Sequence, residues 1–265
     1  MSKFDEIGFL AEDNLDFMPA LEARYGKYIE ICKELNTYSQ KLQYELVVHN
    51  KHLPELLSSI LFSRVLSTYQ AALLVSFKGM RQQVIILIRC ILEPLFPLVA
   101  ISKDHTFSHE LVKAEEVERL NELNKLIRYK ERNNIDVAEL AQLKAKKIIV
   151  TKNNKKNNLK KISVFDCAKK SGLEDWYYTL YAFTSSTLHS SVRSLEEALH
   201  LDPTREEIIA LKYEPESEGF DDLYITLSEC LMHAISSICS IFDLNEPEII
   251  EDCRRRVRKL EGNFA

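Results

Sequence analysis

The feature that most constrains the fold is one apolar segment, residues 81–102, which reads RQQVIILIRCILEPLFPLVAIS. It is apolar on nearly every side, so as a helix it has to be covered by other elements on most of its faces. The β-branched run VIILI could instead form a strand, but the length of the segment and its lack of alternation favour a helix. We therefore expect a central helix with other helices packed around it.

The rest of the chain predicts further long helices. Only six glycines and seven prolines occur among 265 residues, which argues against a turn-rich β fold. Apolar spacings of three and four, together with helix start and stop signals, predict helices over the following ranges: 19–50, 54–77, 104–132, 136–150, 163–172, 174–200, 222–242 and 246–261. Residues 204–214 are ambiguous between a helix and a short strand. The predicted fold class is all-α, a bundle of long, mostly antiparallel helices in one domain.

Within that domain we divide the chain by composition. Residues 19–102 form the N-terminal helices of the core, residues 163–242 its C-terminal helices, and residues 246–265 a basic terminal helix. Between Lys144 and Lys161 there are eight lysines and no acidic residue. This Lys- and Asn-rich composition is typical of a loop, so we interpret residues 144–162 as a basic loop insertion.

Composition also bounds the class of protein. The net charge of −5 and the pI of about 5.9 do not fit a globally basic nucleic-acid binder. Six cysteines contain no C-x-x-C pair and fall in apolar helical patterns, which predicts reduced core residues and a cytoplasmic protein. The N-terminus does not have the pattern of a signal peptide. The longest charge-free stretch of the apolar region, residues 65–77, is thirteen residues long, whereas a membrane-spanning helix needs about 20. We therefore expect no contact with a membrane.

Several motifs that would name a chemistry are missing. The sequence contains no G-x-G-x-x-G, G-x-x-x-x-G-K, G-x-S-x-G or H-E-x-x-H, which disfavours dinucleotide enzymes, P-loop kinases, α/β-hydrolases and zincins. His105 and His109 have a spacing that can hold zinc, but they lack a fixed third ligand. A solvated helix start explains them better, so we predict no metal and no cofactor.

Arg89 and Glu93 are the first candidate site. They are four residues apart, so they share one face of the apolar helix. Losing one partner of a buried ion pair costs roughly 3–5 kcal/mol, so each needs a polar partner. Pro94 and Pro97 follow directly and are expected to kink the helix. The alternative interpretation is a structural salt bridge between core helices.

His189 lies in the stretch SSTLHSS, residues 185–191, inside the helix predicted over 174–200. On a helix Tyr181, Ser185 and His189 lie near one face. An unperturbed histidine titrates near pH 6.5, so beside an arginine it could serve as the acid or base of phosphodiester cleavage. Internal RNA cleavage needs no metal, because the 2′-hydroxyl is the nucleophile. The alternative is a core or interface histidine bonded to a hydroxyl.

The basic segments are candidates for binding phosphates. Lys155 and Lys156 of the lysine-rich segment are the predicted substrate contacts, together with Tyr181. No aromatic residue interrupts these lysines, so base stacking within the segment has no support. The basic run CRRRVRK near the C-terminus suits a charged surface helix or a tail that binds an acidic partner.

The segments QQVIILIRCILEPLFPLVAISKD and WYYTLYAFTSSTLHSS together resemble a bacterial helical family of unknown function, number 5677 in its series. Its members have an Arg-x-x-x-Glu helix followed, about a hundred residues later, by a Tyr…Ser…His-Ser segment, and the resemblance covers about residues 55–240. That family is similar to the HEPN (higher eukaryotes and prokaryotes nucleotide-binding) superfamily. Those proteins are all-α, often dimeric, and many are RNases of toxin–antitoxin and anti-phage systems.

The usual HEPN nuclease motif places an arginine four to six residues before the histidine on one helix. Here Tyr181 to Thr184 lie in that place, and Arg193 follows His189. A nuclease would therefore need Arg89, from another helix or another protomer, to supply the charge.

The first hypothesis is a metal-independent endoribonuclease acting as a toxin or an anti-phage defence effector. In it His189 is the acid or base, Arg89 stabilises the phosphate, Glu93 orients Arg89, and Ser185 or Ser190 bonds the substrate or the histidine.

Two alternatives remain open. One is a non-catalytic helical module that binds RNA or a protein partner, such as an antitoxin or another defence component, with Arg89, Glu93 and His189 as a structural polar core. The other is a small-molecule or nucleotide sensor. The buried third helix and the apolar seam on residues 222–241 also suggest a homo-oligomer.

Overall fold

The fold is all-α, as predicted. The chain was studied as a computed structural model, which describes residues 3–11, 17–133, 137–202, 204 and 207–261. Its long helices have these bounds: α2 Phe17–Glu45, α3 Leu53–Ser76, α4 Arg81–Lys103, α5 Phe107–Arg132, α6 Val137–Lys156, α11 Asp221–Ile241 and α12 Glu248–Glu261. The shorter elements are α1 Lys3–Ile7, η1 Gly8–Leu10, α7 Val164–Ser171, α8 Glu174–Trp176, the π-helical turn η3 Tyr177–Tyr181, α9 Ala182–Leu188, α10 Val192–Leu195, η4 Glu196–Ala198, and the strands β1 Leu199–Leu201 and β2 Ile208–Leu211.

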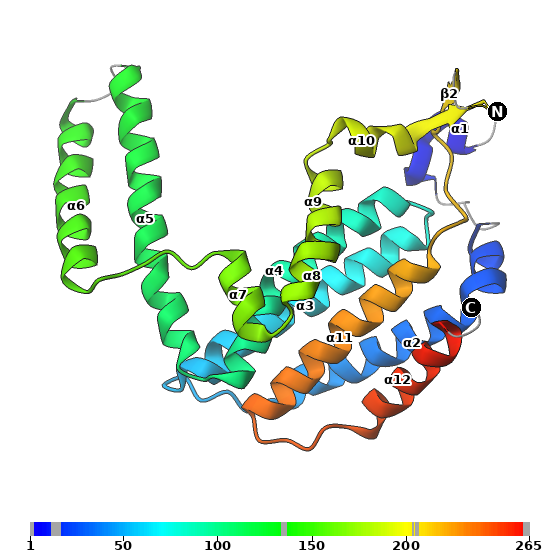
Figure 1. Cartoon of the computed structure of the whole chain (residues 1–265), viewed down its shortest axis with the longest axis horizontal. Helices are drawn as coiled ribbons and strands as arrows, with labels where there is room; N and C mark the ends of the chain where they lie inside the picture. The colour runs from blue at the N-terminus through cyan, green and yellow to red at the C-terminus, as the bar shows by residue number, and fades with distance from the viewer. Residues whose placement is uncertain (1–2, 12–16, 134–136, 203, 205–206, 262–265) are drawn as a thin grey trace.

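Helix α4 is the centre of the bundle, as its apolar sequence predicts. It packs against α3 and α11 and, on another side, against α7 and α9 (Figure 1). More than half of its side chains are buried, and Pro94 and Pro97 lie inside it without ending it. Helix α2 covers α11 and α3 from outside, and α12 lies along α2 and α11. This packing fixes α4 in place, together with any polar residue that it carries.

Two polar features tie the outer helices to this core. The buried Tyr69 hydroxyl of α3 donates to the carbonyl oxygen of Cys32 on α2 at 2.9 Å. Arg256 of α12 pairs with Glu34 and Glu30 of α2 at 2.6 and 3.2 Å. All six cysteines are free, and all but Cys90 are buried, as their apolar surroundings predict.

Among the residues that the structure describes, two helices are long and apolar enough to cross a membrane by length and composition alone: α4 and α11. Within the apolar window of each helix, 72% of the residues of α4 and 67% of those of α11 are buried inside the fold. Core helices of soluble proteins have this property, and their apolar faces here are covered by the other helices of the chain.

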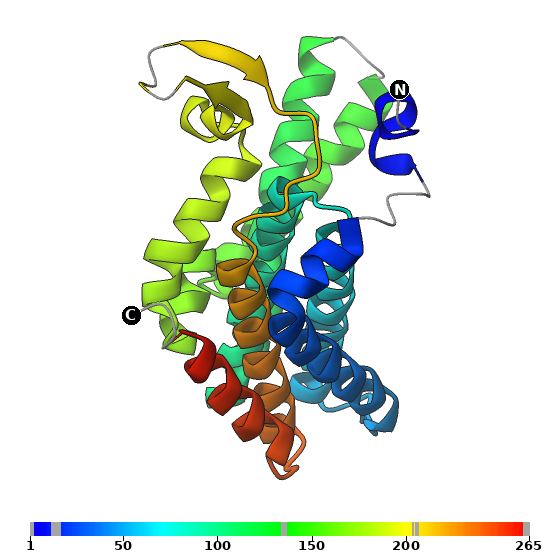
Figure 2. The ribbon, with the colours of Figure 1, turned by 90° about the vertical axis from the view of Figure 1, so that its right-hand side faces the viewer.

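Helices α5 and α6 form an antiparallel pair that projects from the bundle (Figures 1 and 2). The predicted basic loop over residues 144–162 is wrong for most of its length, because α6 is helical as far as Lys156 and only residues 157–163 form the connection to α7. Lysine is a good helix former, and contacts with α5 support the helix. Lys144 pairs with Glu131 at 2.7 Å, and the Asn154 side chain donates to the carbonyl oxygen of Glu116 at 3.0 Å.

Helix α7 begins and ends where its sequence predicts. Ser163 and Asp166 form a reciprocal capping box at its N-terminus, and Gly172 follows its last turn with φ of +70°. The helix predicted over residues 174–200 is instead broken. It consists of α8, η3 and α9, stops at Leu188, resumes briefly as α10 and then enters a β-hairpin in which Leu199 pairs with Leu211. The ambiguous segment 204–214 therefore supplies a strand, β2.

Candidate functional site: the Arg89 cluster and the lysine groove

Helices α4 and α9 bring the two predicted site segments together. Arg89 of α4 donates from Nε to the Ser185 hydroxyl of α9 at 2.8 Å, and its Nη2 donates to the hydroxyl of Tyr181, the last residue of η3. Nη1 pairs with Glu93, one turn further along α4, at 2.9 Å. We call these four residues, Arg89, Glu93, Tyr181 and Ser185, the Arg89 cluster. The structure thus joins residues that lie about a hundred positions apart in the chain.

The guanidinium of Arg89 is sealed by its partners. Arg89 is only 7% exposed, and its Cζ lies 3.5 Å from the centre of the Tyr181 ring, within cation–π range. Burial raises the pKa of Tyr181, and the nearby Arg89 charge opposes that rise. Tyr181 therefore stays a neutral phenol at neutral pH and can accept the guanidinium hydrogen bond.

Glu93 is the solvent-facing edge of the cluster. Its side chain is 52% exposed, whereas that of Arg89 is almost fully covered. A half-exposed pair at i, i+4 contributes only about 0.3–0.5 kcal/mol. The contacts that hold Arg89 are therefore mainly those with Tyr181 and Ser185, which the sequence placed on the same predicted helix face.

The π-helical turn η3 sets the position of Tyr181. The ring of Tyr177 stacks on that of Tyr181, with centroids 4.9 Å apart and an angle of 19° between their planes. Phe96 of α4 lies against the other end of this pair, 6.1 Å from Tyr181. Single π-helical turns are frequent at functional sites, but here the turn also has a plain packing role, because it seats the tyrosine pair against α4.

His189 lies outside the Arg89 cluster, at the end of α9. Its backbone N–H bonds to the carbonyl oxygen of Ser185 at 3.1 Å, so the histidine is one turn away from the hydroxyl that binds Arg89. The next residue, Ser190, has φ of +49° and turns the chain out of the helix. His189 and Ser190 are exposed, and within the described part of the chain no hydrogen bond or ion pair involves the His189 side chain.

The nuclease hypothesis requires the guanidinium of Arg89 to lie beside the imidazole of His189. The structure brings their segments together, but it buries Arg89 among its own chain's hydroxyls and leaves His189 at an exposed helix end. Their catalytic roles, and those of Glu93, Ser185 and Ser190, stay predictions.

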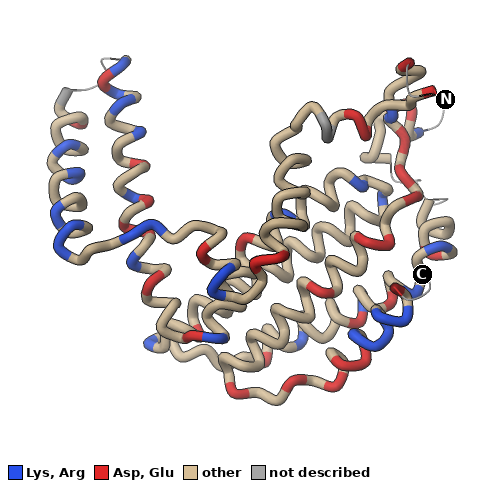
Figure 3. Tube along the Cα trace, viewed as in Figure 1, with Lys and Arg blue, Asp and Glu red and all other residues tan. Residues whose placement is uncertain are grey.

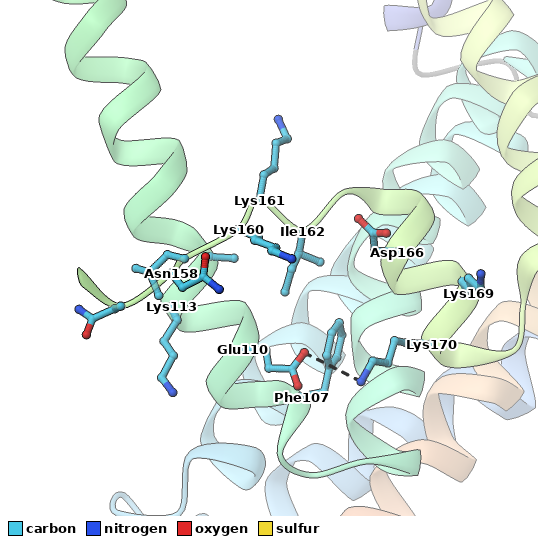
Figure 4. A pocket seen from close by; sticks show the side chains of 13 residues that line it. Phe107, Glu110, Lys113, Asn158, Lys160, Lys161, Ile162, Asp166, Lys169 and Lys170 are labelled. Atoms are coloured by element: carbon cyan, nitrogen blue, oxygen red, sulfur yellow. Dashed lines mark ion pairs between the residues drawn. The ribbon is translucent and has the colours of Figure 1, made fainter. Parts of the chain in front are cut away.

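A second candidate site is a groove between the base of α5, the α6–α7 connection and α7. It has a volume of about 670 Å³ and is shown in Figure 4. We call it the lysine groove because five lysines line it: Lys113, Lys160, Lys161, Lys169 and Lys170. Two carboxylates, Glu110 and Asp166, also line it, together with Asn157 and Asn158. The groove therefore carries a net positive charge on a protein whose total charge is negative.

Ion pairs occupy some of these lysines and leave others open. Lys161 pairs with Glu118 at 2.7 Å, and Lys170 lies 3.9 Å from Glu110 (dashed line in Figure 4) and 3.5 Å from Asp104. Within the described part of the chain Lys113, Lys160 and Lys169 form no ion pair. These three ammonium groups are available to a bound anion.

The predicted substrate contacts Lys155 and Lys156 lie at the C-terminal end of α6, directly before Asn157 of the groove. They are exposed but are not among the groove-lining residues. Basic residues gather along α6 and the connection to α7 (Figure 3). The sequence pointed to this basic segment, but it missed Lys113, because only the tertiary structure places α5 beside the segment. It also missed Lys169, which lies on the helix that directly follows the segment.

The two histidines considered for zinc, His105 and His109, are both exposed at the start of α5. Across the residues that the structure describes, no group of three or more His, Cys, Asp or Glu side chains has a geometry that could hold a metal ion.

Comparison with known proteins identifies a family. The model of a family of unknown function (DUF5677) matches residues 55–208, a range that contains α4, the lysine groove and the whole Arg89 cluster. No curated protein and no solved structure matches the chain significantly.

Proposed function

The chain belongs to a family of unknown function, DUF5677, and we propose that it is a non-catalytic helical module that binds RNA. The observation that carries this proposal is the lysine groove, which is lined by five lysines from three parts of the chain. The HEPN-like resemblance of the sequence agrees with a nucleic-acid ligand.

Charge supports an RNA backbone as the ligand. Lysine ammonium groups bind phosphates as point charges and release counterions, which gives affinity without sequence preference. The groove also carries two asparagines, Asn157 and Asn158, whose amides can donate to phosphate and ribose oxygens. Lys113, Lys160 and Lys169 form no ion pair with any residue that the structure describes, so no such pair has to break before an anion binds.

In this proposal the Arg89 cluster is a structural brace between α4 and α9. Each nitrogen of the Arg89 side chain already has a partner in Ser185, Glu93 or Tyr181. Buried polar groups with all partners satisfied hold a fold in one arrangement. Phosphate could reach the guanidinium only after the tyrosine or the serine moved away.

The test measures binding of a short labelled RNA by fluorescence anisotropy over a series of salt concentrations. Each phosphate that a lysine neutralises changes the slope of log K against log salt by about −0.7 to −0.9. The double variant Lys113→Ala/Lys160→Ala should therefore bind more weakly at low salt, with a slope shallower by about 1.5. Lys27→Ala/Lys51→Ala is the matched control, because these two lysines are exposed elsewhere on the chain and their loss changes the net charge equally. Equal weakening by both pairs would refute the groove as the binding site.

A specific contact keeps the ribonuclease as a second candidate. Arg89 binds Ser185, and Ser185 is one helical turn from His189, so a modest shift of α9 would open the arginine toward the histidine. As a toxin or defence effector, such an enzyme should slow growth on expression and cleave total RNA. His189→Ala should then lose about 10²–10⁴-fold in rate, whereas equal growth and intact RNA with the wild type, His189→Ala and Arg89→Ala would remove this candidate.

A further inference from the structure

A row of aromatic rings begins beside the lysine groove and ends at Arg89. Phe165 of α7 lies 5.1 Å from Tyr177 and 5.8 Å from Tyr178, measured between ring centroids, and Tyr177 stacks on Tyr181. We call these four residues, Phe165, Tyr177, Tyr178 and Tyr181, the aromatic row. Arg89 covers Tyr181 and closes the inner end of the row.

Helix α7 belongs to both the lysine groove and the aromatic row. Phe165 directly precedes Asp166, which lines the groove, and lies one turn before Lys169, so the ring and the Lys169 side chain share one face of α7. Ile162, three residues before Phe165, also lines the groove. Figure 4 shows Ile162, Asp166 and Lys169 on the side of the lysine groove that is formed by the connection and α7. Two of the groove lysines, Lys169 and Lys170, and the ring of Phe165 therefore lie on one short helix.

Tyr178, at the end of the aromatic row away from Arg89, is open to solvent. Tyr178 is 61% exposed, although its ring contacts both Phe165 and Tyr177. A tyrosine that is held by other rings and still offers so much surface is a suitable platform for a nucleobase, since every base has a flat face that can stack on it. The nearby lysines would neutralise the phosphates on either side of such a base.

We propose that the lysine groove and the aromatic row together bind single-stranded RNA, with phosphates on the lysines and a base stacked on Tyr178 beside Phe165. This inference rests on the proposed function and narrows it. A duplex offers the same phosphates but keeps its bases paired inside, so it cannot use the ring. An acidic protein segment would use the lysines and leave Tyr178 without a role.

The first experiment compares Tyr178→Ala with Tyr213→Ala, each binding the same unpaired strand. Tyr213 is the matched control, because it is 70% exposed and follows β2, which lies across the molecule from α5 and α6 (Figure 1). One lost stack should weaken binding about 5-fold to 150-fold, the equivalent of about 1–3 kcal/mol. The salt slope should not change, because no phosphate contact is lost. Tyr178→Trp should keep the affinity, and Tyr213→Ala should bind as the wild type does.

The second experiment uses the wild-type chain, so it does not depend on how a variant folds. A duplex of the same sequence and an abasic strand of the same length should both bind more weakly than the unpaired strand. Ultraviolet crosslinking with a strand that contains 5-iodouridine should label Tyr178 or Phe165.

The results separate the inference from the proposed function. Lysine-dependent binding with no effect of Tyr178→Ala, or with equal affinity for the abasic strand, would overturn the stacking inference alone. If no RNA bound at low salt, or if the groove lysines did not matter, the proposed function would fall and the inference with it.

Discussion

Removing the guanidinium of Arg89 should destabilise the fold far more than removing the charge of its ion-pair partner. Arg89 donates to Ser185 and Tyr181 in a buried setting, whereas Glu93 is half exposed. A hydrogen bond to a charged group contributes about 1.5–3 kcal/mol. Two such bonds, less the desolvation cost that the variant no longer bears, give an expected loss of about 3 kcal/mol for Arg89→Ala, at the lower end of the range for breaking a buried charge network.

Substitutions at the other members of the Arg89 cluster should lower the free energy of unfolding by less than Arg89→Ala does. Ser185→Ala leaves the Nε donor of Arg89 buried and unpaired, which costs about 1–3 kcal/mol. Glu93→Gln should cost under about 0.5 kcal/mol, because exposed i, i+4 pairs contribute no more than that. Arg89→Lys keeps the charge but not the planar fork that reaches three partners, so it should fall between Arg89→Ala and the wild type.

Equilibrium urea unfolding followed by far-ultraviolet circular dichroism measures these differences in the free energy of unfolding. A double-mutant cycle between Arg89→Ala and Ser185→Ala should show coupling above about 0.5 kcal/mol, as contacting residues do. The structural role of Arg89 would be refuted if the free energy of unfolding of Arg89→Ala lay within about 0.5 kcal/mol of the wild-type value, which is the range of surface substitutions. A Glu93→Gln cost equal to that of Arg89→Ala would refute the ranking.

Three other features give independent predictions. Gly79 has φ of +73°, and a Cβ there would lie 2.7 Å from Cζ of Phe17, so Gly79→Ala should lower the free energy of unfolding by about 1–3 kcal/mol in a urea titration. Burial lowers the pKa of His233. As the pH falls, the unfolded chain therefore binds the proton before the folded chain does. The contribution of His233 to the free energy of unfolding is complete above about pH 6.5 and is lost as the pH drops through the folded pKa. His233→Gln should reduce this loss of stability at acid pH, and an unchanged profile of stability against pH would contradict the prediction. Burial raises the pKa of Cys167 to about 12, so a thiol reagent at neutral pH should label the half-buried Cys90 first, by mass spectrometry.

Local signals in the sequence were sufficient for many of the helices. Pro54 lies in the first turn of α3, Gly79 lies between α3 and α4, and Ser163 and Gly172 bound α7. Each of these signals acts within one turn of backbone, where proline, glycine and a capping hydroxyl have fixed conformational preferences. Such boundaries can be predicted without knowing the rest of the fold.

Two segments were misjudged where local signals conflicted with packing. Residues 144–156 were interpreted as a loop from composition, yet they form part of α6, where α5 supplies Glu131 to Lys144 and the Glu116 carbonyl oxygen to Asn154. The run SSTLHSS was expected inside one helix, yet the helix ends at Leu188 and Ser190 adopts a positive φ. Its serines and threonines compete for backbone hydrogen bonds, which is a signal that could have marked the end.

The sequence alone determined that an arginine in the middle of an apolar helix must find polar partners, because an unpaired buried charge is too costly. It could not say which ones. Tyr181, Ser185 and His189 were equal candidates on one predicted face, and only the packing of α9 on α4 gave Arg89 the first two and left His189 at the exposed end. In the same way, Lys113 lies more than thirty residues before the basic run, and only the tertiary structure brings the base of α5 beside the α6–α7 connection in the lysine groove. Residue chemistry is local, whereas the meeting of distant side chains depends on how whole helices bury their apolar faces.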